Sequence, residues 1–441
     1  MLDLDIIKIA TERAVEYVQT DRDLYKPIFI EVESYITSNP LILGVDTSIA
    51  IGKGVQPILY EVFSHDALKQ IKGLADIVFR IDPEGLTRYT NVTTKLEHKQ
   101  FSLQVNGRDI AFFINLPKHH GVEIFNVVMP IFQESLLTKK PLACASTELQ
   151  LIQLYMNLSN PKMASEWICN MEDEKRIRKI FLKDFRIRLP KIIEGGSSFD
   201  HKQKKKSRRD FYDQLNSEFI YKDHHAIVGN LAIRPNDRGR IQLITSLDIN
   251  VEVKTVYYIG SQNGFNIQWC INPVRLPIDT RLQKATLFFV ENDKKEPFMD
   301  IFNNAFYDLV PYSIKTKIAS VIVLLKYILI DIWTIQTLIK MHVIDKSYAE
   351  DILKNFIVDF EELSEELDEP SPKLFPFTFL GSYDDEALNI RRKSVQFYPP
   401  YYPLNNILQK NTTNPTTITD SAKGSLATGL DYRFMYEDAE Y

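Results

Sequence analysis

The chain has 441 residues, of which 44 % are hydrophobic, enough for two or three domains with packed cores. Its formal net charge of −5 excludes a histone-like polycation, so any affinity for nucleic acid must come from local patches. Three scattered cysteines (Cys144, Cys169 and Cys270) exclude a disulfide framework and a zinc knuckle, and favour a reducing compartment.

The first half of the chain alternates short strand and helix patterns. The N-terminal stretch MLDLDIIKIATERAVEYV carries acids among its apolar residues, which predicts an amphipathic helix and not a signal peptide. The pattern then predicts a helix over 65–79 and strands at 41–44, 60–63, 90–94, 100–105 and 110–116. Asn106-Gly107 predicts a hairpin turn. This order predicts an α+β fold with a mixed sheet.

Two helices are predicted over 146–158 and 161–185. After them, neither the helix nor the strand period of apolar residues continues. The sequence EGGSS and the basic run HKQKKKSRRD predict a linker over 194–210. We therefore expect domains over 1–193 and 211–403, followed by a polar flexible tail over 404–441.

The second half repeats part of this pattern. Strands are predicted before the Gly229-Asn230 turn and at 241–247, 253–259 and 286–290, and helices over 320–339 and 348–367. Both halves run from a strand into a glycine turn, LILG at 41–44 and AIVG at 226–229, which leaves a duplicated core as one possibility.

The segment 320–339 is long enough to span a bilayer. Lys326 and Asp331 fall near its middle, where each would cost about 2.5–3.5 kcal/mol. Their spacing of five places them poorly for mutual neutralisation on a helix. We therefore predict a core or interface helix and no membrane contact.

The basic run offers a candidate nucleic-acid contact. It comprises Lys202, Lys204, Lys205, Lys206, Arg208 and Arg209. Such a run can neutralise several phosphates in a salt-dependent way, but a solvated loop and a nuclear-import signal remain open. Phe211 and Tyr212 follow and could stack on bases, which favours RNA.

No metal site is expected at the histidines. His119-His120 and His224-His225 are adjacent pairs, and neighbours on a strand point to opposite faces. The sequence places no other histidine or cysteine at metal-ligand spacing nearby.

Several motifs occur in order over residues 40–403. They are the glycine turn at Gly44, YEVFS (60–64), the strands from Thr90, STELQLIQLYMNLSNPKMASEW (146–167), GNLA (229–232), IFNNAFYDLVPY (301–312), FTFLGSYDDE (377–386) and FYPPYYP (397–403). Together they resemble the poly(A) polymerase catalytic-subunit family of large nucleocytoplasmic DNA viruses.

The resemblance implies a two-lobed α+β protein. The N-terminal lobe would be a nucleotidyltransferase-like domain of the polymerase-β type, and the C-terminal lobe a related but non-catalytic one. The family adds adenylates to viral messenger RNA. The implied location is the host cytoplasm, at the viral factory, or the virion.

The chemistry of such enzymes needs carboxylates that hold two Mg²⁺ ions. The family pattern maps these carboxylates onto Leu59, Glu61 and Phe112, of which Glu61 alone is an acid. Val45 stands after Gly44, where family members have a second small residue. We therefore expect a vestigial site without metal or cofactor.

Three functions stay open. The first is a catalytically degenerate subunit that binds RNA or a protein partner, as a homodimer or as a heterodimer with an active poly(A) polymerase subunit. The second is an active polynucleotide adenylyltransferase that uses Mg²⁺ at a displaced site, with Asp46 or Asp109 as the replacement acid. The third is a non-enzymatic virion or transcription-complex component.

Overall fold

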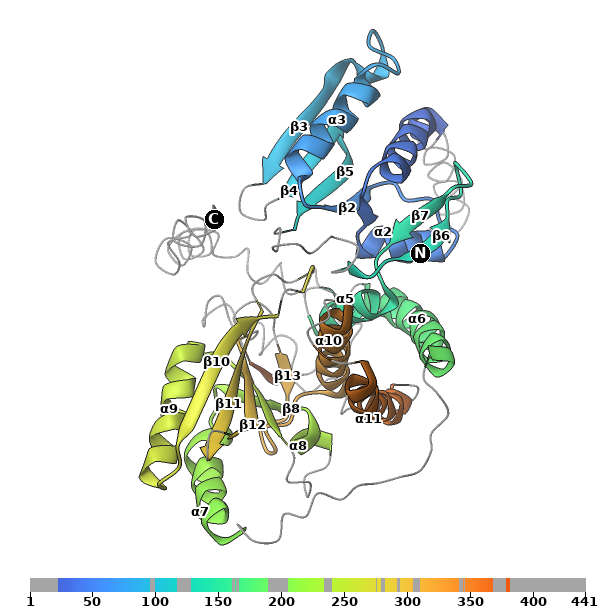
Figure 1. The fold of residues 1–441 in the computed structure, drawn as a ribbon. Coiled ribbons are helices and arrows are strands. Elements are labelled where there is room, and N and C mark those ends of the chain that lie inside the picture. The colour runs from blue at the N-terminus through green and yellow to red at the C-terminus, as the bar shows by residue number, and fades with distance from the viewer. Residues whose placement is uncertain are drawn as a thin grey trace, which may run out of the picture. The chain divides into compact units, whose positions relative to one another are not determined.

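The architecture comes from a computed structural model of the chain (Figure 1). It describes residues 23–95, 100–116, 128–160, 163, 166–188, 205–233, 240–274, 276–278, 282–291, 294–303, 310–340, 344, 346–367 and 378–380. The predicted N-terminal helix before residue 23, Lys202, Lys204, the FYPPYYP motif and the predicted tail lie outside these residues.

The chain divides into two compact units. The first comprises Met1–Gln150 and Thr337–Ile344, and the second Leu151–Gln336 and Asp345–Tyr441. Residues 151–188 thus group with the second unit, whereas the predicted first domain ends at 193. Much of the predicted linker lies outside the described residues, so the linker itself stays a prediction.

The first unit is built on a seven-stranded mixed sheet in the order β3-β4-β5-β2-β1-β7-β6. The strands are β1 (Ile42–Leu43), β2 (Tyr60–Ser64), β3 (Thr90–Lys95), β4 (Gln100–Val105), β5 (Arg108–Asn115), β6 (Ile131–Glu134) and β7 (Pro141–Cys144). The Asn106-Gly107 turn joins β4 to β5 with φ of 51° and 78°, as a two-residue hairpin requires.

Helices bury the apolar side chains of this sheet. α3 (Ala67–Phe79) packs along β3, β4 and β5 through Ile71, Leu74 and Val78, which recur at helical spacing. A helix over 23–38 adds Phe29 and Val32 to the same core. The short α2 (Val45–Gly52) follows β1 directly and was not expected from the sequence.

The second unit contains a five-stranded sheet in the order β10-β11-β12-β9-β8. Its strands are β8 (His225–Val228), β9 (Ile241–Thr245), β10 (Ile267–Pro273), β11 (Gln283–Glu291) and β12 (Lys294–Phe302). A separate pair joins β13 (Val310–Tyr312) to β14 (Thr378–Leu380). Its helices include α5 (Thr147–Ser159, which starts in the first unit), α6 (Trp167–Arg188), α7 (Lys205–Leu215), α8 (Asn230–Ile233), α9 (Ile249–Gln262), α10 (Val321–Lys340, which ends in the first unit) and α11 (Lys346–Glu365).

The strand predicted at 253–259 is wrong, because these residues lie in α9. The Asp248 side chain caps that helix by accepting from the backbone N–H of Asn250. Ile249, Val253, Val256 and Ile259 are buried at helical spacing, and packing overrides the strand preference of β-branched residues.

The apolar segment 320–339 forms α10, and 72 % of its most apolar stretch is buried inside the structure. α10 is the one described helix long and apolar enough to span a membrane, a property that buried core helices share. Lys326 and Asp331 are both buried, and the Asp331 carboxylate accepts from Lys284 Nζ at 3.0 Å.

The two sheets repeat one arrangement. In each, an N-terminal strand runs into a glycine and a short helix, and the next strand pairs in parallel with a later one: β2 with β5, and β9 with β12. Two further antiparallel strands complete the order β3-β4-β5-β2-β1 in one and β10-β11-β12-β9-β8 in the other. This common order supports the duplicated core suggested by the glycine turns.

Candidate active site in the first unit

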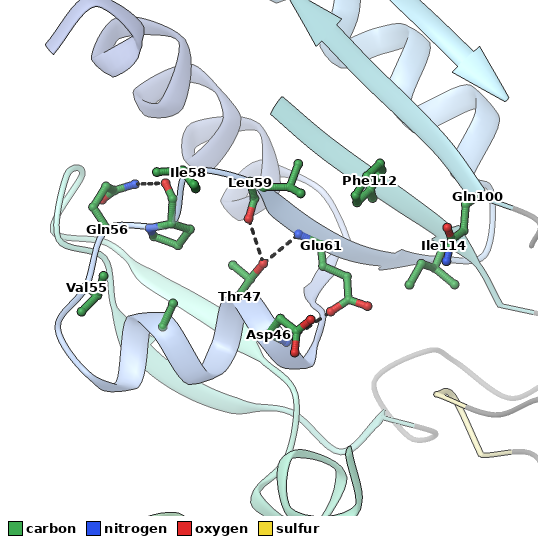
Figure 2. Close-up of a pocket in the computed structure, with 12 residues that line it drawn as sticks. Asp46, Thr47, Val55, Gln56, Ile58, Leu59, Glu61, Gln100, Phe112 and Ile114 are labelled. Carbon is green, nitrogen blue, oxygen red and sulfur yellow. Dashed lines mark hydrogen bonds between the residues drawn. The ribbon is translucent and has the colours of Figure 1, made fainter. Parts of the chain in front are cut away.

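The positions that the family pattern assigns to metal-binding carboxylates converge on one cavity (Figure 2). Leu59 and Glu61 alternate along the chain into β2, and Phe112 lies opposite Glu61 on the parallel strand β5. The cavity has a volume of about 430 Å³. The three positions assigned by the resemblance thus line one cavity in the folded chain.

Most of the cavity wall is apolar. Leu59 and Phe112 contribute hydrocarbon where the chemistry of nucleotidyl transfer needs oxygen ligands. Ile58, Val55 and Ile114 extend this surface. Among the described residues that line the cavity, the acids are Glu61 and Asp46.

The Glu61 side chain lies at the N-terminus of α2. Its Oε2 accepts from the backbone N–H of Asp46 at 3.3 Å, and its carboxyl lies so close to Gly44 that a Cβ there would approach within 2.3 Å. A helix N-terminus attracts anions because its N–H groups have no partner within the helix. Glu61 therefore occupies the end of α2 that attracts anions.

Burial and then the nearby charge of Asp46 raise the pKa of Glu61 to about 7, although hydrogen bonds from the Asp46 and Val45 backbone act in the opposite direction. At neutral pH a large share of this carboxyl is therefore protonated. A protonated carboxyl is a poor ligand for a hard cation.

Thr47 ties α2 to the chain entering β2. Its Oγ1 accepts from the backbone N–H of Glu61 at 2.7 Å and donates to the Leu59 carbonyl at 3.4 Å. These bonds hold Leu59 and Glu61 in their orientations along the cavity wall (Figure 2).

Of the two candidate replacement acids, Asp46 and Asp109, one lines the cavity and the other does not. Asp46 lies in the first turn of α2 and lines the cavity beside Glu61. Asp109 does not: Ser102 Oγ and Gln104 Nε2 donate to its Oδ1, the latter at 2.9 Å, and it is absent from the cavity wall.

The second unit places different chemistry at the equivalent positions. Gln242 on β9 stands opposite Asp300 on β12, as Glu61 stands opposite Phe112, and its amide oxygen closely approaches Gly229. Asp300 is buried and accepts from Arg240 Nη2 at 2.5 Å and Thr286 Oγ1 at 2.7 Å, with Lys284 Nζ at 3.3 Å.

Sequence reasoning missed this buried charge cluster. A single aspartate in the run KKEPFMDIF (294–302) was the available signal, but its partners are remote in sequence. Lys284 bridges Asp300 and Asp331, so cations already neutralise these acids. The arrangement is suited to holding the sheet and α10 together rather than to binding Mg²⁺.

The predicted basic run is helical from Lys205, because α7 begins there. Arg208 makes a bidentate pair with Glu296 at 2.9 and 3.1 Å and lies over the Phe289 ring at 4.7 Å. Its charge is therefore matched within the protein. Arg209 is exposed, with its Nε 3.9 Å from Asp213.

The expectation that Phe211 stacks on bases is corrected. Phe211 is fully buried, and its ring packs against Phe265, Phe289 and Phe298. Phe211 belongs to the apolar face of α7, which packs into the core. This face was not recognised in the sequence because its apolar residues, at helical spacing, lie among basic ones.

No known family model matches the chain. An uncharacterised protein of African swine fever virus (a tick isolate from Malawi) is 30 % identical over 425 residues, covering 91 % of this chain and 97 % of the viral protein. The chain belongs to the family of this swine fever virus protein. Its counterpart in a South African tick isolate is 29 % identical over 427 residues, with the same coverage of both chains.

One solved structure places the swine fever virus protein family among known folds. The Megavirus polyadenylate synthase matches with a TM-score of 0.59 at 14 % identity, covering 96 % of this chain and 90 % of the synthase. This confirms the expected two-lobed, poly(A) polymerase-like nucleotidyltransferase fold. At this identity the likeness concerns the fold alone.

Proposed function

We propose that this member of the swine fever virus protein family is a catalytically degenerate poly(A) polymerase-like subunit that acts in viral mRNA polyadenylation by holding RNA or a partner subunit. The observation that carries the proposal is the cavity of the first unit, where Leu59 and Phe112 occupy two of the three expected carboxylate positions. Transfer of a nucleotide through two metal ions needs ligands at all of these positions.

The state of Glu61 supports the same proposal. Its carboxyl is engaged by the Asp46 backbone at the N-terminus of α2, and its pKa is raised to about 7. A productive nucleotide would have to displace this carboxyl and then use it as a metal ligand. One group cannot serve both as the internal cap of α2 and as a ligand of two ions.

A second candidate is an active adenylyltransferase with a displaced Mg²⁺ site. The observation in its favour is that Asp46 and Glu61 line the same cavity. Two carboxylates can hold one divalent ion, and a bound ion would lower the pKa of Glu61 by favouring its charged form.

Incorporation of radiolabelled ATP into an RNA primer, with Mg²⁺ or Mn²⁺, separates the two candidates. The degenerate subunit should extend the primer no further than a reaction without protein, and Glu61→Gln and Asp46→Asn should behave like the parent chain. An active poly(A) polymerase serves as the positive control. Tail extension that is lost in Glu61→Gln and kept in the exposed Glu84→Gln would overturn the proposal.

A further inference from the structure

Two adjacent histidines and a glutamate converge in the second unit. His224 and His225 precede and begin β8, and Glu252 lies in the first turns of α9. One ligand atom from each lies within 4.8 Å of the others. Adjacent side chains point to opposite faces only within a strand. His224 belongs to the turn before β8, and its ring therefore lies on the same side as that of His225.

The donor atoms are spaced as metal ligands are. His225 Nε2 lies 2.9 Å from one carboxylate oxygen of Glu252, and His224 Nε2 lies 3.5 Å from the other. Bonds of about 2.0–2.1 Å in a tetrahedral zinc site place neighbouring donor atoms about 3.3 Å apart. The two separations bracket this value, so a small adjustment would admit an ion.

A backbone carbonyl faces the other ring nitrogen of His225. Its Nδ1 faces the Phe219 carbonyl at 2.8 Å, at the end of the π-helical turn Asn216–Ile220. A donated N–H at Nδ1 leaves the lone pair on Nε2, which points at Glu252. Histidines that bind metals commonly use a backbone carbonyl in this way to set their tautomer.

The fully buried His225 has an oxygen atom within hydrogen-bond distance of each ring nitrogen, the Phe219 carbonyl at Nδ1 and the Glu252 carboxylate at Nε2. A divalent cation would satisfy the neutral imidazole and the carboxylate together.

We propose that His224, His225 and Glu252 form a site for a divalent transition-metal ion, best suited to Zn²⁺. Two imidazoles and one carboxylate disfavour Mg²⁺ and Ca²⁺, which take oxygen ligands, and match the three-ligand sets that bind zinc. The His224 side chain is 33 % exposed, which gives the ion a route from solvent and leaves room for water as the fourth ligand. The ion would fasten the start of β8 to α9.

The surrounding charges are compatible with this site. Burial, and then the neighbouring His225, lower the pKa of His224, which favours the neutral ring that binds metal. The positive charge of Lys222 would repel a metal ion. The next residue, Asp223, carries a negative charge, and Lys317 Nζ donates a hydrogen bond to it at 2.6 Å. The site does not depend on the proposed function, since its residues all lie in the second unit.

The test uses the full chain, stripped with a chelator and then titrated with Zn²⁺ against a chromophoric competitor. One zinc ion per chain is expected, and His224→Ala and Glu252→Gln should each weaken the apparent Kd more than about 100-fold, because losing a ligand weakens binding more than losing a group that only hydrogen-bonds to a ligand. His65→Gln, which removes a histidine from the first unit, should leave the apparent Kd unchanged.

Cobalt supplies an independent measurement. Co²⁺ should give visible d–d absorption with tetrahedral intensity in the parent chain and in His65→Gln, and this absorption should vanish in His224→Ala. Circular dichroism without metal checks that each variant is folded. Because the His224 side chain is partly exposed, His224→Ala should perturb the fold less than a change at the buried Glu252. Absence of stoichiometric zinc, or equal zinc binding by His224→Ala and the parent chain, would overturn the proposal.

Discussion

At the scale of single residues, Glu61 shows how an acidic side chain can be engaged within the fold. Its carboxyl lies at the N-terminus of α2, beside Gly44. Gly44 is required there because any Cβ would collide with the carboxyl. The same contact recurs at Gly229 with the uncharged Gln242, which indicates that this approach is a packing feature of the fold.

The raised pKa of Glu61 has a consequence for stability. Its pKa rises from 4.5 to about 7 on folding, so between these values the unfolded chain releases a proton that the folded chain keeps. The free energy of unfolding therefore falls as pH rises through this window. Glutamine cannot ionise, so the thermal midpoint of Glu61→Gln relative to the parent chain should be higher at pH 8 than at pH 5.

Thermal unfolding followed by circular dichroism at both pH values measures this difference. Glu84→Gln, at an exposed carboxylate, is the control and should show no comparable change with pH. A difference between Glu61→Gln and the parent chain that is the same at pH 5 and pH 8 would contradict the assigned environment of Glu61.

At the scale of elements, the buried charges of the second unit connect β11, β12 and α10. Lys284 on β11 pairs with Asp300 on β12 and with Asp331 on α10. Burial lowers the pKa of Lys284, but Asp331 and Asp300 raise it by more, so its charge is held. Asp331, one of the two charged residues that make α10 a poor membrane span, thus also fixes α10 to this sheet.

Lys284→Met should destabilise the second unit by about 3–5 kcal/mol, because it leaves Asp331 buried without its cation. Lys295→Met, on the exposed part of β12, should stay within about 0.5 kcal/mol of the parent chain. Chemical denaturation measures both. Adding Asp331→Asn to Lys284→Met should recover part of the loss; no recovery would show that the charge pair is not the cause.

At the scale of the whole molecule, a net charge of −5 confines any RNA affinity to local patches. The basic run remains the leading candidate, although Arg208 is paired with Glu296. Arg209 is exposed on α7, and Lys205 and Lys206 belong to the same helix.

Replacing Lys204, Lys205 and Lys206 with serine should weaken binding to single-stranded RNA and lower the slope of log K against log salt by about 0.7 for each lost phosphate contact. Fluorescence anisotropy at several salt concentrations measures both quantities. Replacement of Lys254, Lys294 and Lys295, which are exposed in the second unit, is the charge-matched control. Absence of salt-dependent binding by the parent chain would leave a protein partner as the ligand of this subunit.

The sequence predicted best those elements whose stabilising interactions lie within a few residues of one another. The strand around Glu61, the Asn106-Gly107 hairpin and α3 follow from periodicity and turn chemistry within a few residues. The positions of Leu59 and Phe112 followed from the resemblance, since periodicity does not show that two strands pair side by side. α9 escaped prediction because its β-branched residues favour a strand until the core on one side is known.

The sequence by itself determined which chemical groups the cavity lacks, because no packing can turn leucine or phenylalanine into a metal ligand. It also predicted a core or interface helix over 320–339, because Lys326 and Asp331 would be costly in a membrane. Tertiary structure alone decided that Glu61 caps α2, that Phe211 lies in the core, and that His224, His225 and Glu252 meet. Each of these depends on contacts between segments remote in the chain, whose geometry is set by the packing of complete sheets and helices.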